Sequence, residues 1–151
     1  IWVHVVHNMD PYYTDFWKNR QDRDAFELYF KTLLEGLLEF SQIDTLGHLD
    51  YVVRYSPNRD SNYSPRDYQD VIDEILKFII EKEIKLEINT SNLSKGFDFF
   101  NPHTDIIKRY KELGGKYVTL GSDAHKAEYI GYGFDKAYEI ANSFDLKIFT
   151  L

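Results

Sequence analysis

The alternation of short apolar strands with longer helical segments is the feature that most constrains how this chain can fold. Five strands are predicted, at residues 1–6, 43–46, 85–89, 116–120 and 146–149. The segments between them are long enough for helical crossovers, which join parallel strands. The sequence therefore predicts an α/β fold with a parallel sheet, whose working residues follow the carboxyl ends of the strands.

Apolar residues at helical spacing predict the intervening helices. Ser64 is expected to cap the second helix, with Pro65 in its first turn. The dipeptide Asn101–Pro102 is expected to open the third helix. The four predicted helices cover residues 21–40, 64–79, 101–113 and 135–143.

The length of 151 residues limits how much of a parallel barrel the chain can supply. A complete barrel usually needs about 250 residues, so the chain is expected to form either the second half of a barrel or an open sheet. No linker composition divides it, and residues 1–151 are predicted to be a single domain. The first residues already have a strand pattern and lack an initiator Met, so we expect structure upstream of Ile1.

Charge and composition exclude several classes of function. The chain has 18 Lys and Arg against 25 Asp and Glu, a net charge of −7. An acidic balance argues against nucleic acid or an anionic membrane as partner, but it allows a small phosphorylated substrate held by one or two Arg. No Cys is present, so disulfides and thiolate metal sites are excluded, which is compatible with the cytoplasm.

Side chains suited to metal binding gather at the predicted strand ends. Imidazole and carboxylate groups are ligands for Zn, Mn or Fe, and their convergence from several strands is how a polynuclear site is built. Such a site can bind phosphate and generate hydroxide near neutral pH. The candidates are His4, His48, Glu87, Asn89, Asp123 and His125.

Each candidate also has an ordinary structural interpretation. A lone His is more often a hydrogen-bonded polar residue than a ligand, and Asp123 could cap a helix. Arg54 could be a surface residue. Glu87 is harder to dismiss, because a carboxylate in an apolar strand needs a partner. His103, near a helix start, is taken as a non-ligand.

Three motifs resemble the polymerase-and-histidinol-phosphatase (PHP) superfamily, and most closely its histidinol-phosphate phosphatases. They are GHLDY at 47–51, LEINTS at 86–91 and GSDAH at 121–125, and they occur in the family order. The resemblance covers nearly the whole chain. It implies a distorted (β/α)7 barrel, with this chain as its C-terminal portion, and a trinuclear metal site. The implied reaction is hydrolysis of L-histidinol phosphate to histidinol and phosphate in histidine biosynthesis.

The resemblance also implies roles for individual residues. His4, His48, Asp123 and His125 match the metal ligands of the family, and His4 is preferred over His7. Asp123 and His125 are assigned a catalytic role, since either could pass a proton to the leaving group. The predicted substrate-binding residues are Arg54, Glu87, Asn89 and Lys95.

Two departures from the family pattern limit these inferences. The opening His-x-His pair and the metal-bridging Glu would lie upstream of Ile1, so this fragment alone is expected to be inactive. The family motif Thr-Ser-Gly-Leu-Arg is here Thr-Ser-Asn-Leu-Ser at 90–94, so an Arg expected to hold phosphate is missing. Lys95 could replace it as a point charge.

Three functional interpretations follow from the sequence. The first is a metal-dependent, cytoplasmic L-histidinol phosphate phosphatase. The second is a PHP phosphoesterase with another small phosphorylated substrate, which the missing Arg favours. The third is a non-catalytic PHP interaction module. A nuclease is the weakest interpretation because no basic track is present. The sequence leaves metal identity and oligomeric state open.

Overall fold

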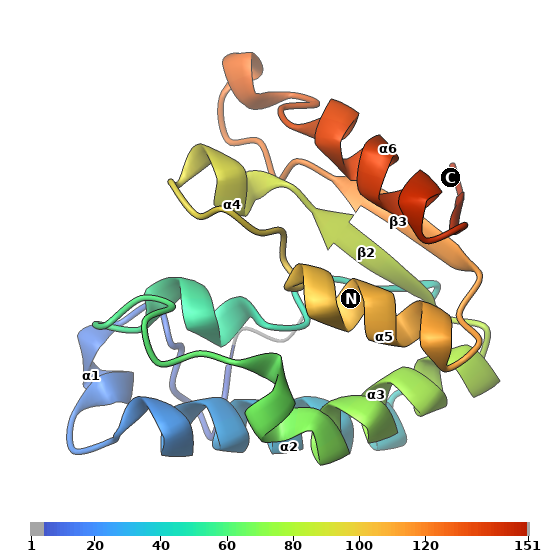
Figure 1. Ribbon diagram of the computed structural model, residues 1–151. Coiled ribbons are helices and arrows are strands. Elements are labelled where there is room, and N and C mark those ends of the chain that lie inside the picture. Colours follow the sequence, from blue (N-terminus) through green and yellow to red (C-terminus); the bar gives the residue numbers. More distant parts are fainter. Residues whose placement is uncertain (1–4, 151) are drawn as a thin grey trace.

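The computed structural model describes residues 5–150 as helices around a parallel sheet (Figure 1). Three short 3₁₀ helices lie in the loops, at Tyr51–Tyr55, Pro65–Tyr68 and Ala127–Tyr129. The strands are β1 (Thr45–Leu46), β2 (Lys85–Asn89), β3 (Tyr117–Gly121) and β4 (Lys147–Ile148). The α-helices are α1 (Thr14–Trp17), α2 (Asp22–Glu39), α3 (Gln69–Glu81), α4 (Ser91–Ser94), α5 (Thr104–Glu112) and α6 (Phe134–Ser143).

The sheet has the strand order β1-β2-β3-β4, and all neighbouring strands are parallel. Leu86 pairs with Val118, and Asn89 pairs with Gly121 at the carboxyl end. The predicted parallel α/β fold is therefore confirmed. Because the strands run the same way, the loops that follow β1, β2 and β3 meet at one edge of the sheet.

The predicted first strand is not part of the described sheet. Residues 1–4, which include the candidate ligand His4, lie outside the described residues. Val6 forms an isolated antiparallel bridge with Met9 across a tight turn. His7 and Asn8 occupy that turn with positive φ, and the His7 side chain is exposed.

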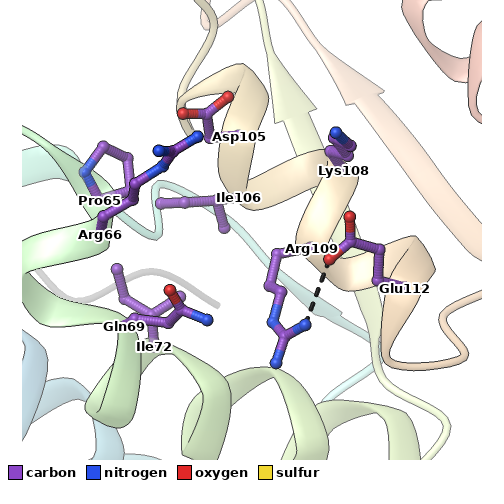
Figure 2. Close-up of a pocket in the computed structure, with 9 residues that line it drawn as sticks. All are labelled: Pro65, Arg66, Gln69, Ile72, Asp105, Ile106, Lys108, Arg109 and Glu112. Carbon is purple, nitrogen blue, oxygen red and sulfur yellow. Dashed lines mark hydrogen bonds and ion pairs between the residues drawn. The ribbon is translucent and has the colours of Figure 1, made fainter.

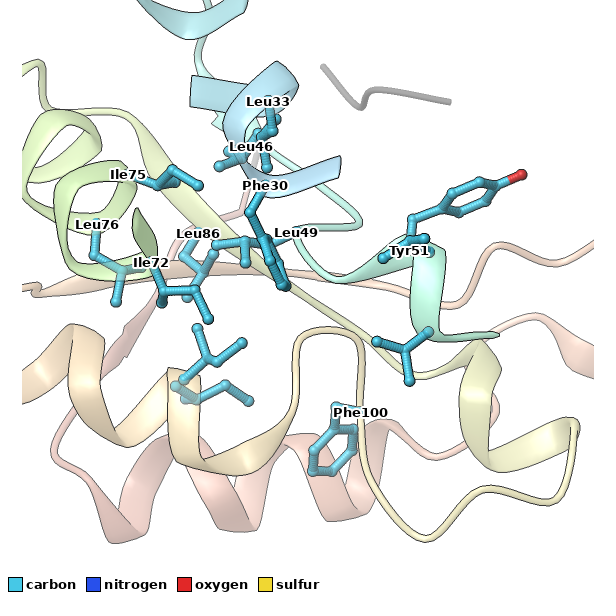
Figure 3. Packing of buried hydrophobic residues seen from close by; sticks show 14 of the residues in the cluster. Phe30, Leu33, Leu46, Leu49, Tyr51, Ile72, Ile75, Leu76, Leu86 and Phe100 are labelled. Atoms are coloured by element: carbon cyan, nitrogen blue, oxygen red, sulfur yellow. The ribbon is translucent and has the colours of Figure 1, made fainter. Parts of the chain in front are cut away.

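Buried apolar side chains of the helices and strands form the hydrophobic core (Figure 3). Phe30 and Leu33 of α2 and Ile72 and Leu76 of α3 are buried in the same cluster as Leu86 of β2. Each fully buried side chain of this kind stabilises the fold by roughly 1.5–3 kcal/mol. The apolar side chains that α2 and α3 bury in the core are thus among those that the sequence places at helical spacing.

Strand β2 serves both the core and the site. Leu86 and Ile88 are fully buried, and successive side chains of a strand point to opposite faces. Glu87 and Asn89 therefore point to the face opposite the core, near the carboxyl end of the strand. The same strand that is held by the core presents these polar groups.

The two predicted helix starts differ in outcome. Ser64 precedes a helical turn with Pro65 in its first position, as predicted, but the turn is the 3₁₀ helix that leads into α3. The Ser64 side chain makes no cap; its backbone carbonyl accepts from Asp67 N (3.1 Å). Asn101 does not open a helix because its backbone exchanges two hydrogen bonds with Asn89, which keeps it extended. Helix α5 begins at Thr104, after His103 Nδ1 accepts from Asp105 N (3.1 Å).

A small groove of about 140 Å³ separates the 3₁₀ turn before α3 from α5, and Arg109 lies on its wall (Figure 2). The Arg109 guanidinium donates to both carboxylate oxygens of Asp73, at 2.8 and 2.6 Å, and to Glu112 at 3.2 Å. This bidentate pair joins α3 to α5 outside the apolar core.

Among the described residues, no helix is long and apolar enough to cross a membrane.

The Arg109 hydrogen bonds lower the pKa of Asp73. Because a depressed pKa means that the folded state favours the ionised form, this stabilisation is present above the unfolded-state pKa of about 4 and is lost as the pH falls through the folded-state pKa. Asp73→Asn should lower the thermal midpoint at pH 7 by a few degrees. The difference from the parent should shrink below about pH 4.

The control is Glu74→Gln, which makes the same carboxyl-to-amide change at the exposed neighbouring position. Thermal unfolding followed by circular dichroism from pH 3 to pH 8 measures both variants. An Asp73→Asn variant that melts with its parent at pH 7 would contradict the stabilising role of the pair.

Candidate functional site

Three parallel strands bring one imidazole and two carboxylates together at the edge of the sheet. His48 follows β1, Glu87 lies in β2 and Asp123 follows β3. His48 Nδ1 lies 3.5 Å from Glu87 Oε2, and His48 Nε2 lies 3.4 Å from Asp123 Oδ2. The imidazole is buried, whereas the Asp123 side chain is 27% exposed. The site is therefore closed on the His48 side and open on the Asp123 side.

The backbone after β1 and after β3 adopts an uncommon conformation. His48 has φ of 57° and Asp123 has φ of 48°, both in the left-handed region. Left-handed backbone costs a non-glycine residue roughly 1–2 kcal/mol. Two such residues, after the strands on either side of β2, indicate that these turns are fixed by the surrounding structure.

Arg54 is part of the site and not a surface residue. Its side chain is only 3% exposed, and its Nη1 lies 3.4 Å from Asp123 Oδ2. Its Nε donates to Asn92 Oδ1 (2.8 Å) and its Nη2 to Ser91 Oγ (2.7 Å). The guanidinium is thus held from behind by α4, with one edge against Asp123.

Asn89 holds neighbouring groups in place. Its Oδ1 accepts from Ser91 N (3.0 Å) and Ser91 Oγ (2.6 Å), and its Nδ2 donates to Glu87 Oε2 (3.3 Å). The side chain is buried and its amide is engaged at both ends. Asn89 thus bonds Glu87 directly and reaches the Arg54 guanidinium through Ser91.

Electrostatics keep Asp123 ionised. The hydrogen bond from His48 is the largest cause, and the charges of His48, Arg54 and Lys95 add to it, so the pKa of Asp123 lies well below its usual range in spite of partial burial. Partial burial, followed by the Arg54 charge, lowers the pKa of Lys95, while Asp123 opposes that shift. The Lys95 ammonium therefore lies within electrostatic reach of the same two side chains.

Asp50 is a buried carboxyl group behind the site. It accepts from His103 N (2.7 Å) and the Tyr63 hydroxyl (3.3 Å). Burial raises its pKa to about 7. These contacts tie the residues after His48 to the loop that precedes α5.

His125 is placed next to Asp123 but is turned toward solvent. Its Nε2 lies 3.5 Å from Asp123 Oδ1, and its side chain is 87% exposed. Within residues 5–150, no group of three or more His, Cys, Asp or Glu side chains is arranged to hold a metal ion. The donor types nevertheless suit a divalent metal, because imidazole nitrogen and carboxylate oxygen lie side by side at His48 and Asp123.

The structure thus brings together His48, Glu87, Asn89, Arg54 and Asp123, with Lys95 within electrostatic reach. Sequence reasoning missed Ser91 and Asn92, which anchor Arg54. Their position directly after the EINT run was the available signal, because a polar turn follows a strand end there.

Comparison with known proteins identifies the family. A family model described as PHP domain matches residues 2–91, which is more than half of the chain. The chain belongs to the PHP family. The matched region contains His48, Arg54, Glu87 and Asn89, so the resemblance carried by the sequence motifs is confirmed.

Curated relatives of this PHP chain have consistent names. A probable histidinol-phosphatase of Clostridium acetobutylicum is 41% identical over 145 residues, which cover 96% of this chain and 56% of that protein. The histidinol-phosphatase of Lactococcus lactis is 33% identical over 129 residues, covering 83% of this chain and 47% of that protein. The chain spans about half the length of the curated relatives it matches.

A solved structure resembles the PHP chain over nearly its whole length. It is the crystal structure of histidinol phosphate phosphatase from Lactococcus lactis in complex with zinc, L-histidinol and phosphate. The two agree with a TM-score of 0.82 at 28% sequence identity, over 97% of this chain and 56% of that one. The parallel arrangement of strands and helices is therefore that of a PHP enzyme fold.

Close packing at Gly121 generates a prediction about the site. A Cβ at Gly121 would collide with Glu87 Oε1, whereas a Cβ at Gly36 of α2 would meet no atom within 4 Å. Gly121→Ala should destabilise the protein by about 1–3 kcal/mol through overpacking. Gly36→Ala should stabilise it by about 0.5–1 kcal/mol, because Gly inside a helix is unfavourable.

Denaturant unfolding of the parent and the two variants measures these opposite changes. A Gly121→Ala midpoint equal to the parental midpoint would show that the Glu87 side chain moves aside without cost. In that event, the carboxylate would not be held against β3 as described.

Proposed function

We propose that the intact protein is a metal-dependent phosphomonoesterase that hydrolyses L-histidinol phosphate to histidinol and inorganic phosphate, in histidine biosynthesis. The observation that carries this proposal is the Asp123 carboxylate, which contacts both the His48 imidazole and the Arg54 guanidinium. A metal-type donor pair lies beside a buried cation suited to phosphate. The names of the relatives and the contents of the similar crystal structure support the same substrate.

We propose that the cofactor is a trinuclear cluster of Zn, Mn or Fe. His48, Asp123 and His125 would hold it together with His4, whose position lies outside the described residues. When bound, such ions act as Lewis acids toward phosphate oxygens and lower the pKa of water. The zinc in the similar crystal structure supports a divalent metal.

The side chains of this chain have distinct parts in the proposed reaction. Arg54 binds the phosphate and offsets its negative charge, since the guanidinium is already fixed by α4 and has little reorganisation to undergo. Lys95 provides a second, more mobile cation. Glu87 and Asn89 present polar groups to the substrate at the end of β2. Proton transfer to the leaving alkoxide runs through the Asp123–His125 pair: the ionised Asp123 orients the imidazole, and the exposed His125 gives up the proton and exchanges protons with solvent.

A second candidate function is hydrolysis of another small phosphorylated substrate. Ser94 stands where the family motif has an Arg, and Lys95 lacks the planar fork of a guanidinium. This difference alters how the substrate is held more than it alters the reaction.

We propose that the protein acts in the cytoplasm without nucleic acid or membrane as partner, and that residues 1–151 belong to one PHP domain.

Phosphate release by the intact protein tests the function. L-Histidinol phosphate should be hydrolysed faster than a panel of other phosphomonoesters and nucleotides. A chelator should abolish turnover, and added Zn, Mn or Fe should restore it. Undiminished turnover by metal-free protein would refute the metal-dependent mechanism, and absence of turnover on the whole panel would favour a non-catalytic module.

Replacing Arg54 tests the phosphate contact. Arg54→Lys keeps the charge but cannot make the contacts to Ser91, Asn92 and Asp123 together, so kcat/KM should fall about 10–100-fold. Arg66→Lys, the same change at an exposed position, is the control. Thermal unfolding of both variants separates loss of substrate contact from loss of fold. Parental kcat/KM in Arg54→Lys would exclude Arg54 from substrate binding.

A further inference from the structure

The turn that carries Lys95 is tied at two places, once to the first 3₁₀ helix and once to the segment that follows this helix. From this double tie, we propose that Arg59 is a positioning residue that fixes the backbone of Lys95 and so sets the reach of its ammonium group toward the substrate phosphate. The proposal rests on the proposed function, because it assumes that Lys95 meets a phosphate group. It adds a residue that the sequence motifs do not single out.

The first tie joins Arg54 to α4, through Asn92 Oδ1 at 2.8 Å and Ser91 Oγ at 2.7 Å. The second tie lies at the other end of the same turn. Arg59 Nη2 lies 3.3 Å from the carbonyl oxygens of both Lys95 and Gly96. The two arginines are five positions apart, and they hold α4 at its beginning and just beyond its end.

Arg59 is itself held by an aromatic ring. Its Cζ lies 4.3 Å from the centre of the Phe97 ring, within the range of a cation–π contact. Phe97 is buried in the hydrophobic core, so the ring is a fixed platform. The guanidinium is therefore fixed on one side by the ring and donates on the other to the backbone of Lys95 and Gly96.

The turn leaves these carbonyl groups available for Arg59. The backbone N–H groups of Lys95 and Phe97 both donate to Asn92 O, at 3.0 and 3.1 Å, which closes the turn on itself. Gly96 has φ of 80°, a left-handed conformation that ends the turn. Arg59 thus holds the main chain at Lys95, while the Lys95 residue remains accessible to solvent.

Holding the backbone has a functional consequence at this position. A lysine is a flexible point charge, so its effective concentration at a phosphate depends on where its backbone is held. In this chain the cation comes one residue later than the Arg of the family motif, next to Ser94. Contacts as exposed as those of Arg59 contribute little to global stability, so their loss should loosen the turn and leave the fold intact.

A double-mutant cycle in the intact, metal-loaded protein tests the proposal. Arg59→Ala should raise KM for L-histidinol phosphate and the inhibition constant of inorganic phosphate about three- to tenfold, while kcat stays within about twofold. Lys95→Met should do the same. In the Lys95→Met background, adding Arg59→Ala should cause no further loss, because the group that Arg59 positions is gone.

Two further variants sharpen the cycle. Arg59→Lys keeps a cation near Phe97 but cannot bridge two carbonyls as a guanidinium does, so its effect should be intermediate. Arg66→Ala, which removes an exposed arginine beside α3, should leave both constants unchanged. Metal content should equal the parental value in every variant, since Arg59 contacts none of the candidate ligands among its described contacts.

Unchanged constants in Arg59→Ala, or an equal loss in the parent and Lys95→Met backgrounds, would overturn the proposal. Failure of the proposed function is distinguishable, because the parent would then not hydrolyse L-histidinol phosphate. Calorimetric titration of the metal-loaded protein with inorganic phosphate tests the positioning role of Arg59 without turnover. Equal dissociation constants for the parent and Arg59→Ala would overturn it there as well.

Discussion

The carboxylate of Asp123 is the point at which otherwise separate parts of the chain meet. It faces His48, which is 75 positions earlier in the sequence, and Arg54, which is 69 positions earlier. Neither contact is short, at 3.4 Å each, but a half-buried anion between two partly desolvated donors is stabilised more strongly than the same groups in water. Through this carboxylate the loops after β1 and β3 are joined to the 3₁₀ helix at Tyr51–Tyr55.

Strand β2 explains how a polar site and an apolar core lie so close together. Ile88 is fully buried, while its neighbours Glu87 and Asn89 point to the opposite face and bind His48 and Ser91. The packing free energy of the strand therefore also fixes the polar groups. The Arg54 guanidinium is held one layer further out by Ser91 and Asn92. The side chains of the site are therefore most constrained next to β2 and least constrained at the exposed His125.

The sequence predicts the arrangement of strands and the gathering of polar residues at their ends, because parallel topology alone dictates where strand ends lie. It does not predict the burial of Arg54, since that depends on two side chains nearly forty positions away. At Ser64 local rules predict the helical turn at the correct position, but the Ser64 side chain does not cap it. At Asn101 a tertiary pairing with Asn89 overrides the local helix signal. The local rule fails at Asn101 because a partner on strand β2 decides the backbone.

The left-handed backbone at His48 and Asp123 restricts which amino acids can occupy these positions. β-Branched side chains are strongly disfavoured there, whereas Asn, Asp and His tolerate the conformation. The amino acid at each of these two positions must therefore meet two conditions: it must tolerate the left-handed turn, and it must supply the chemical group that the site uses. Asparagine at position 123 would remove the negative charge and keep a tolerated backbone, whereas valine would change both at once. The geometry of the turn thus tells an experimenter which replacements isolate charge from shape.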